Sequence, residues 1–348
     1  MLHILFVIYN LSKEAGNSLQ AFNLAKQISL TKHQVTFITT NINEKQRRFF
    51  KNKKIKCYHL NIKNEKVNPL IIQSKLLKII KQVLSKEDVD LIQLFDPIST
   101  GILGLYALIK YQKPIIIRLG TIFEKFYASK LKSLSPLLKG NIDKIFEVII
   151  EKLLKLYIQL ILINSSVIIS NSYFIENYYK NSIYEDKMFI IPNGVDLRIF
   201  SENKFNFNEN DFGLYIGRIE PRKSINMIIK AYFKLSNKSR PERLYLIGDH
   251  ELDPNYTKIL KELIKKLDLD HKIIFKGFVN QKYLYNYYKN ARYTIFSSND
   301  CFFPITEGLP NVILEAMASG SIIVASDIAG VPEIIRDCEN GFIYNSHS

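Results

Sequence analysis

Short apolar runs alternate with helical patterns along this chain, and that alternation constrains the fold more than any other feature. An apolar run of four to eight residues is typical of a strand buried on both faces of a parallel sheet. Segments with helical periodicity, such as Leu19–Ile28 and Pro69–Leu84, separate the runs. In the first half of the chain, the predicted strands are Ile4–Ile8, Gln34–Thr39, Leu91–Phe95, Ile115–Leu119 and Val167–Ser170.

A second series of the same kind follows a polar, asparagine-rich stretch at residues 201–210. Its predicted strands are Phe212–Gly217, Arg243–Gly248, Lys272–Phe275, Tyr293–Ser297 and Ile322–Ser326. A chain of 348 residues is too long for one ordinary core. The sequence therefore predicts an α/β fold with two Rossmann-like domains, residues 1–192 and 211–348, joined by a linker at 193–210. Ligands of such domains bind at the carboxyl ends of the strands, here in a cleft between the two domains.

Three features predict a cytoplasmic protein. The start, Met1–Tyr9, has no basic region and no cleavage site, so it is interpreted as a buried strand rather than a signal peptide. The longest apolar region, residues 153–170, is interrupted by polar residues and predicts a helix followed by a strand rather than a membrane span. The three cysteines, Cys57, Cys301 and Cys338, are far apart and match no disulfide or metal-site spacing.

The net charge of +15 is concentrated in the first half of the chain. Residues 1–200 contain 29 Lys and Arg against 15 Asp and Glu, whereas residues 201–348 contain 19 against 18. A nucleic acid, an acidic membrane surface or an anionic substrate would each match this excess. A general bias toward Ile, Lys and Asn is the alternative explanation.

Two carboxylates, Glu307 and Glu315, are separated by seven residues that include a Gly/Pro turn. The turn, Gly308-Leu309-Pro310, lets the backbone approach a ligand and starts the next helix, where Asn311 and Val312 offer backbone N–H groups. The N–H groups and the dipole at a helix start favour an anion such as phosphate. One carboxylate could then meet a sugar and the other a ribose. The alternative is an amphipathic helix with two solvated glutamates.

Cations and glycines follow the first strand of each domain. Arg218 directly follows Gly217, and Lys223 comes five positions later. A planar guanidinium with a mobile ammonium suits a diphosphate leaving group. In the first domain, Gly16 ends the loop after the first strand and could allow close approach of a phosphate. An ordinary surface loop and a plain helix cap are the respective alternatives.

The order and spacing of these residues resemble the retaining GT-B glycosyltransferases of family 4. The similarity covers nearly all of residues 190–344 and is looser over the first domain. The motifs that carry it are Asn193-Gly-Val-Asp196, Gly217-Arg218…Lys223, Leu246-Ile-Gly248-Asp249, Phe275-Lys-Gly277-Phe278-Val279, Tyr287–Ala291, Glu307…Glu315-Ala-Met-Ala and Ser326–Glu333.

The resemblance implies a role for each matching residue. Arg218 and Lys223 would hold the donor diphosphate, Glu307 would lie beside the donor sugar, and Glu315 would bind the nucleotide ribose. The donor-binding set is completed by Gly16, Gly217, Phe278 and Val279 near the base, and Gly308, Leu309, Pro310, Asn311 and Val312 around the phosphates. The family implies no cofactor and no metal, and the sequence has no Asp-x-Asp cluster placed for a divalent ion.

The chain departs from the family pattern at two places. Many relatives have a histidine after the strand that matches Ile115–Leu119, but this chain has Arg118-Leu-Gly120-Thr121 there. Arg118, together with Asp96, is the candidate for the acceptor side, and a core-edge arginine is the alternative. The family also continues past Tyr344 with helices, the last of which crosses back to the first domain, whereas this sequence stops at Ser348. We expect that loss to expose apolar surface and loosen the cleft.

The sequence thus predicts a metal-independent hexosyltransferase with a nucleotide sugar as donor. The acceptor would be a glycan or a lipid-linked sugar of the bacterial cell envelope, as in lipopolysaccharide or capsule biosynthesis, and no nucleic acid is expected. The basic, aromatic segments 46–54 and 123–134 suit peripheral contact with the inner face of the plasma membrane, or they are ordinary amphipathic helices. An inactive binding protein and a sugar-nucleotide epimerase on the same fold are the alternative functions.

Overall fold

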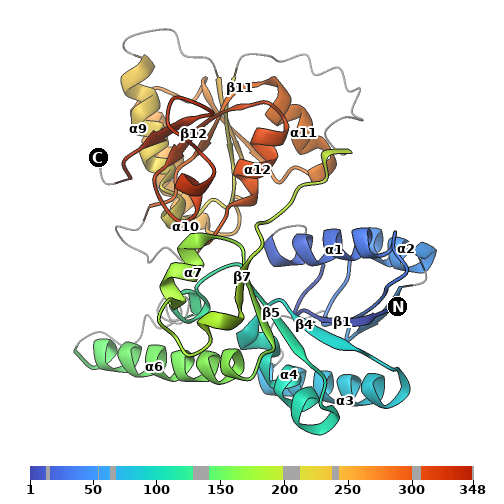
Figure 1. The fold of residues 1–348 in the computed structure, drawn as a ribbon. Coiled ribbons are helices and arrows are strands. Elements are labelled where there is room, and N and C mark those ends of the chain that lie inside the picture. Colours follow the sequence, from blue (N-terminus) through green and yellow to red (C-terminus); the bar gives the residue numbers. More distant parts are fainter. Residues whose placement is uncertain are drawn as a thin grey trace. The chain divides into compact units, whose positions relative to one another are not determined.

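The computed structural model describes residues 1–12, 16–53, 55–62, 68–127, 141–198, 212–236, 243–299 and 307–346. These residues form two compact units, Met1–Asn193 and Gly194–Ser348. Each unit is a parallel sheet with helices on both faces (Figure 1). Most of the predicted linker, from residue 199 to residue 210, lies outside the described residues.

The described part of unit 1 contains a seven-stranded sheet in the order β3-β2-β1-β4-β5-β6-β7. The strand order reverses between β1 and β4, which is where this class of sheet binds ligands. The strands are β1 His3–Val7, β2 Gln34–Thr39, β3 Lys56–His59, β4 Leu91–Leu94, β5 Ile115–Leu119, β6 Val167–Ser170 and β7 Met188–Ile190. The helices are α1 Gly16–Ile28, α2 Glu44–Lys53, α3 Pro69–Lys86, α4 Pro97–Tyr111, α6 Asn141–Ile163 and α7 Tyr173–Tyr179, with a 3-10 turn η1 at Glu185–Lys187.

The described part of unit 2 contains a six-stranded sheet in the order β10-β9-β8-β11-β12-β13. The strands are β8 Phe212–Ile216, β9 Arg243–Ile247, β10 Ile273–Gly277, β11 Ala291–Phe296, β12 Ile322–Ser326 and β13 Phe342–Tyr344. The helices are α9 Ile225–Ser236, α10 Pro254–Lys266, α11 Gln281–Asn290 and α12 Asn311–Ala318, with 3-10 turns η2 at Pro221–Lys223 and η3 at Val331–Glu333.

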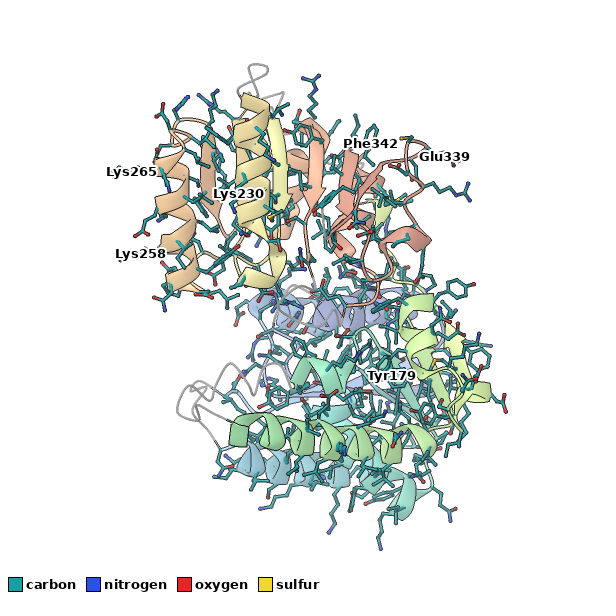
Figure 2. The ribbon with its side chains drawn as sticks, turned by 90° about the vertical axis from the view of Figure 1, so that its left-hand side faces the viewer. Tyr179, Lys230, Lys258, Lys265, Glu339 and Phe342 are labelled. Atoms are coloured by element: carbon teal, nitrogen blue, oxygen red, sulfur yellow. The ribbon has the colours of Figure 1, made fainter. Side chains whose placement is uncertain are left out.

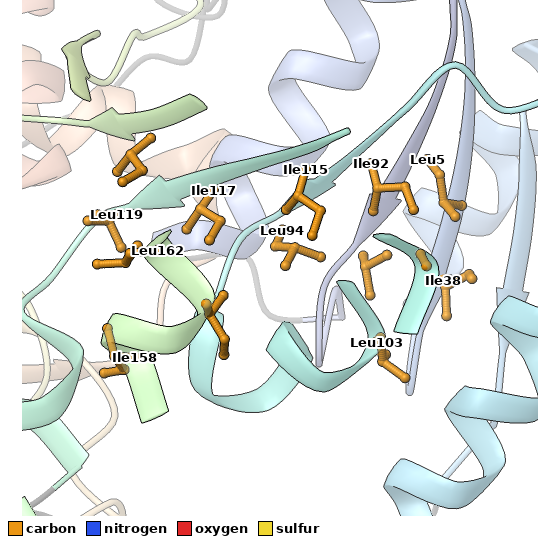
Figure 3. Close-up of a cluster of buried hydrophobic side chains, with 14 of the residues drawn as sticks. Leu5, Ile38, Ile92, Leu94, Leu103, Ile115, Ile117, Leu119, Ile158 and Leu162 are labelled. Carbon is orange, nitrogen blue, oxygen red and sulfur yellow. The ribbon is translucent and has the colours of Figure 1, made fainter. Parts of the chain in front are cut away.

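Each sheet of a unit separates two apolar layers, because successive side chains of a strand point to opposite faces. In unit 1, the larger core lies between the sheet and α3, α4, α6 and α7, and a second core faces α1 and α2. Figure 3 shows strand residues such as Ile92, Ile115 and Ile117 packed against Leu103 of α4 and Leu162 of α6. In unit 2, α9 and α10 cover one face and α11 and α12 the other.

A glycine lets α4 and α6 approach closely. A Cβ atom built on Gly101 would lie 2.0 Å from Cδ1 of Ile161, so a larger residue would require the Ile161 side chain to shift. The hydroxyl of Tyr157 on α6 also donates to the carbonyl of Ile98 at 3.3 Å. This contact fixes which side of α6 faces the core and which side faces outward.

The predicted α/β fold with two parallel sheets is confirmed. The apolar region 153–170 forms the end of α6 and the strand β6, as predicted. Among the described residues, no helix combines the length and the apolar character needed to cross a membrane. The sequence patterns missed three strands, β3, β7 and β13, each of which lies at the edge of its sheet.

Candidate functional site

Glycines mark the carboxyl ends of three adjacent strands in unit 2. Gly217, Gly248 and Gly277 end or follow β8, β9 and β10, and the N–H of Gly248 donates to the carbonyl of Gly277 at 3.0 Å. A Cβ atom on Gly248 would lie 1.9 Å from the backbone oxygen of Gly217, so no side chain fits there. Gly277 has a φ of +70°, a conformation that favours glycine. The backbone at this edge of the sheet is therefore closely packed and free of side chains at the turns.

The η2 turn after β8 brings two cations to Glu307. Nζ of Lys223 donates to Oε2 of Glu307 at 2.9 Å, and Nη2 of Arg222 donates to Oε1 at 2.8 Å. Arg222 also donates to the carboxylate of Glu220. Arg218 is more distant, with Nη2 at 3.3 Å from Glu220 and 3.7 Å from Glu307. We call these five residues the Glu307 cluster.

Lys223 is held firmly within this cluster. Its side chain is buried, and Nζ donates a second hydrogen bond to Oγ of Ser298 at 2.9 Å. Its carbonyl accepts a hydrogen bond from Oγ of Ser297 at 2.6 Å, and Nζ lies 5.0 Å from the centre of the Phe296 ring. Contacts with the end of β11 therefore fix the position of this ammonium before any ligand binds.

The charges of the cluster keep Glu307 ionised. Burial would raise the pKa of Glu307, but the charges and hydrogen bonds of Lys223 and Arg222 outweigh it and lower the pKa to about 2. Both carboxylate oxygens accept hydrogen bonds from cations. At neutral pH Glu307 therefore has no proton to donate, and it acts as a charged hydrogen-bond acceptor. With three cations and two carboxylates, the cluster can accommodate a further anion.

The helix start after Glu307 is the predicted anion site. Pro310 is the N-cap of α12 and has an extended backbone (φ −70°, ψ 123°), so the helix begins at Asn311 rather than at the proline. Leu309 and Pro310 are buried, and Gly308 accepts a hydrogen bond from the N–H of Gly330 at 2.9 Å. Val312 is half-buried on the first turn. The turn is therefore anchored, and its N–H groups follow Glu307 directly along the chain.

Glu315 lies in a different environment from Glu307. It is buried on α12 and accepts a hydrogen bond at 3.0 Å from the hydroxyl of Tyr288 on α11. Burial raises the pKa of Tyr288 well above its usual value, and the charge of Glu315 adds to the effect. Tyr288 could not be predicted from the sequence as a partner of Glu315, because the two residues are on different helices.

The predicted base contacts follow β10. Phe278 is 73% exposed, whereas Val279 is half-buried against the core of unit 2. Cε1 of His250 lies 3.6 Å from the position of a Cβ atom on Gly277, so the turn passes directly beside the imidazole. An exposed phenylalanine beside a glycine turn can stack on a planar ring.

In unit 1, the ends of β4 and β5 meet the start of α1. Gly16 begins α1 with a φ of +56° and has open space around its Cβ position. The amide of Asn17 donates to the carbonyl of Phe95 at 2.8 Å, and its Oδ1 atom would lie 2.6 Å from a Cβ atom on Gly120. Gly120 therefore makes room for Asn17, which the sequence analysis did not single out.

The two acceptor-side candidates make contacts within unit 1. Asp96 is the N-cap of α4, where its carboxylate accepts hydrogen bonds from the N–H groups of Ile98 and Ser99 and from the Tyr127 hydroxyl at 2.9 Å. Burial raises the pKa of Asp96. Arg118 is buried, and its Nη2 donates to the carbonyl of Ile191 and to the amide oxygen of Asn193, both at 3.1 Å. Asp96 and Arg118 thus stabilise the fold, and their contact with an acceptor stays a prediction.

The described residues contain no group of three or more His, Cys, Asp and Glu side chains arranged to hold a metal ion. The Glu307 cluster supplies cationic side chains instead. Of the predicted site residues, Lys223 and Glu307 are in direct contact, and Arg218 is close to both glutamates of the cluster. Arg222 and Glu220 are the members that the sequence analysis missed.

Comparisons with known proteins identify the family of the chain. Residues 16–199 match the family described as Glycosyltransferase Family 4, and residues 198–348 match the family described as Glycosyl transferases group 1. An uncharacterized glycosyltransferase of Methanocaldococcus jannaschii is 31% identical over 45% of this chain and 40% of its own length. The lipopolysaccharide 1,2-N-acetylglucosaminetransferase of Salmonella typhimurium is 26% identical over 51% of this chain and 49% of its own length.

A third relative, from Campylobacter jejuni, is an N-acetylgalactosaminyltransferase named for a diphospho-undecaprenol-linked acceptor. It is 28% identical over 47% of this chain and 41% of its own length. The chain thus matches less than half the length of each of these three relatives.

Solved structures share the fold over the whole chain. The structure of HepE of Anabaena in complex with UDP-glucose has a TM-score of 0.72 at 19% sequence identity. The matched region covers 99% of this chain and 86% of the HepE chain. Sucrose-phosphate synthase of Thermosynechococcus elongatus has a TM-score of 0.74 at 17% identity over 100% of this chain and 87% of its own. These similarities confirm the GT-B fold class that the sequence predicted.

Proposed function

Since the chain belongs to glycosyltransferase family 4, we propose that it transfers a hexose-type sugar from a nucleotide diphosphate sugar to an acceptor, with retention of anomeric configuration. The acceptor is a cell-envelope glycan or a lipid-linked sugar. The observation that carries this proposal is the Glu307 cluster, in which Lys223 and Arg222 hold both oxygens of one ionised carboxylate at 2.9 and 2.8 Å.

Within the cluster, the cations act on the leaving group. As the bond between the anomeric carbon and the diphosphate oxygen breaks, negative charge grows on that oxygen, and Lys223 and Arg218 stabilise it. Lys223 is already immobilised by Ser298, so little reorganisation is needed during the reaction. The N–H groups at the start of α12 receive a phosphate.

Glu307 binds the donor sugar in this proposal and does not attack it. Its pKa of about 2 keeps it ionised, and both of its oxygens are engaged by cations, which makes a covalent intermediate on this residue unfavourable. Retention then follows from attack by the acceptor oxygen on the face that the diphosphate leaves. The acceptor proton passes to the departing phosphate oxygen, and the products are the glycoside and the nucleoside diphosphate. No metal and no cofactor take part.

Glu315, Tyr288 and Phe278 form the nucleoside side of the donor site. Glu315 accepts from the ribose hydroxyl groups, with Tyr288 holding the carboxylate at 3.0 Å. The exposed ring of Phe278, with Val279 beside it, contacts the base. HepE binds UDP-glucose, and this supports a UDP-sugar as the first donor to test.

The lipid-linked acceptor is supported by the Campylobacter relative, whose name specifies a diphospho-undecaprenol substrate. A cytoplasmic enzyme that uses such an acceptor works at the inner face of the plasma membrane. The excess of cations in residues 1–200 suits that surface, because anionic lipids attract lysine and arginine.

The test is nucleoside diphosphate release by the purified full chain from a panel of nucleotide sugars, UDP-glucose first, with and without a lipid-linked acceptor. Glu307→Ala and Lys223→Ala are expected to lower the rate by at least about a hundredfold, the usual effect of removing a group that stabilises developing charge. Glu339→Ala and Lys230→Ala are the matched controls, because Figure 2 shows both side chains on the surface of unit 2. The controls should retain the wild-type rate.

Three outcomes would contradict the transferase proposal. A folded wild-type protein that binds a nucleotide sugar, as judged by thermal stabilisation, but neither transfers nor hydrolyses it would be a binding protein. Conversion of one nucleotide sugar into another, without acceptor and without nucleotide release, would identify an epimerase. Activity that survives both site substitutions would place the chemistry away from the Glu307 cluster.

A further inference from the structure

The outer side of α6 presents an apolar stripe. Its side chains follow each other at alternating intervals of four and three residues, which keeps them on one side of a helix. The opposite side of the helix, including Ile158 and Ile161, is already buried in the core of unit 1. Over 14 residues at 1.5 Å each, the stripe is about 21 Å long. It consists of Ile149 (48% exposed), Leu153 (60%), Leu156 (62%), Leu160 (52%) and Ile163 (40%).

The neighbouring helices extend this surface. Figure 1 shows α3, α4 and α6 on the same face of the sheet of unit 1, and α4 packs against both of the others. On α4, Ile102 is 46% exposed and Ile109 is 80% exposed. Among the described residues, apolar side chains therefore project outward from two adjacent helices of one layer and remain partly exposed.

The exposed charged residues of the same three helices are mainly lysines. Among the described side chains of α3, α4 and α6, only one acidic residue, Glu151, is exposed. Lys152 and Lys155 flank the stripe on α6 itself. The exposed lysines of the three helices are Lys75, Lys78, Lys81, Lys86, Lys110, Lys152 and Lys155.

We propose that this side of α6 and α4 is a docking surface for an anionic lipid bilayer. The α6 stripe enters the boundary between headgroups and acyl chains, and the lysines contact the headgroups while their alkyl stems lie along the apolar surface. The inference rests on the proposed function in one respect, since a lipid-linked acceptor requires the enzyme to reach the membrane. It identifies the helix that makes the contact.

The charge distribution favours a bilayer over a second copy of the chain. In a symmetric dimer formed through the stripe, the same patch of both copies would be paired, and the lysines of one copy would face the lysines of the other. An anionic lipid surface supplies the opposite charge over the whole area. Four charged residues between positions 147 and 163 also make α6 unsuited to crossing the bilayer, so it lies in the interface.

The two segments that the sequence favoured for membrane contact have several aromatic rings turned toward the protein. In segment 46–54, Phe50 is buried and Phe49 packs edge-on against Phe22, so these aromatic rings face the protein. In segment 123–134, Phe123 is buried, and residues 128–134 lie outside the described ranges. Phe50 and Phe123 are thus buried and Phe49 is half-buried, whereas the α6 stripe is exposed.

The experiment is co-sedimentation of the full chain with phosphatidylcholine vesicles, with and without phosphatidylglycerol, in the absence of donor. The double variant Leu153→Gln, Leu156→Gln should lower the partition coefficient of the protein between vesicles and solution at least about tenfold. The reason is that binding no longer transfers two leucine side chains out of water. Ile259→Gln is the matched control, since Ile259 on α10 is 57% exposed but lies in unit 2. It should bind as the wild type does.

A second pair of variants tests the electrostatic part. The double variant Lys152→Gln, Lys155→Gln should bind vesicles that contain phosphatidylglycerol more weakly than the wild type, by roughly fivefold per lysine. Added salt should reduce this difference in binding between the wild type and the variant. The control is Lys258→Gln with Lys265→Gln on α10, which Figure 2 shows projecting from unit 2. Because all four lysines are on the surface, these variants remain informative even if the leucine variant folds poorly.

Equal vesicle binding by the α6 variants and their controls would overturn the proposal. It would also be overturned if the leucine variant changed only the self-association of the chain in sedimentation velocity, since the stripe would then be a protein interface. Thermal stabilisation by UDP-glucose, measured on the same samples, distinguishes the two proposals. A variant that loses vesicle binding but keeps donor stabilisation supports the docking surface independently of catalysis.

Discussion

Replacing Glu307 by glutamine should destabilise unit 2 in a manner that depends on pH. The pKa of Glu307 is lowered from 4.5 to about 2 by Lys223 and Arg222. At 1.36 kcal/mol per pKa unit, the ionised carboxylate contributes roughly 3 kcal/mol to the free energy of unfolding at neutral pH. In Glu307→Gln, this contribution is lost, and three cations remain beside a single carboxylate, Glu220.

The sign of the pH dependence follows from the lowered pKa. The contribution is fully present above pH 4.5, where Glu307 is ionised in the folded and the unfolded chain, and it is lost as the pH falls toward 2. The difference in unfolding free energy between wild type and Glu307→Gln should therefore be about 3 kcal/mol at pH 7 and shrink between pH 4.5 and 2. Urea denaturation, followed by a probe in unit 2, measures this difference.

Glu339→Gln is the matched control for this measurement. Glu339 is in the same unit and also pairs with an arginine, Arg336, at 3.5 Å, but its side chain is 67% exposed. Exposed pairs contribute at most about 1 kcal/mol. If Glu307→Gln destabilises the protein no more than Glu339→Gln at pH 7, the argument that the cluster holds a strongly stabilised carboxylate is refuted.

Three further substitutions test other parts of the structure. Gly248→Ala should cost more than about 2 kcal/mol in urea denaturation, because its Cβ atom would overlap the backbone oxygen of Gly217. Tyr288→Phe should lower the free energy of unfolding by about 1.5–3 kcal/mol, since it removes a hydrogen bond to the buried carboxylate of Glu315. A nucleotide titration of the same variant should show weaker binding than that of the wild type. Asp96→Ala should lower the thermal midpoint through the loss of the α4 cap, a cost of about 1–2 kcal/mol; an unchanged midpoint would contradict the cap.

The central strands could be predicted closely from the sequence, whereas three of the four edge strands of the two described sheets, β3, β7 and β13, could not. Ile115–Leu119 and Val167–Ser170 form strands with the predicted bounds. A central strand of a parallel sheet is covered on both faces, so it needs an uninterrupted apolar run. The missed strands, such as Lys56–His59 and Phe342–Tyr344, have a neighbour on one side only and contain exposed residues, so no such run marks them.

The candidate site was predictable as a set of residue types but not as a set of contacts. Lys223 and Glu307 are both named by the sequence, and they pair at 2.9 Å although 84 positions separate them. Arg222 was missed because a cation on a loop is ordinarily solvated, and only the η2 turn places it against Glu307. The partner of Glu315, Tyr288, depends in the same way on the packing of α11 against α12.

The sequence alone therefore determined the parallel sheets, because a buried strand requires an apolar run, and it predicted the residues of a donor site, because ligand chemistry requires particular residue types at short spacing. The tertiary structure decided which charged groups meet, because that depends on loops brought together across many residues. It also decided which side of α6 is exposed. Residues 149–163 are apolar on both sides of the helix, and only the close packing at Gly101 shows that the stripe from Ile149 to Ile163 faces outward.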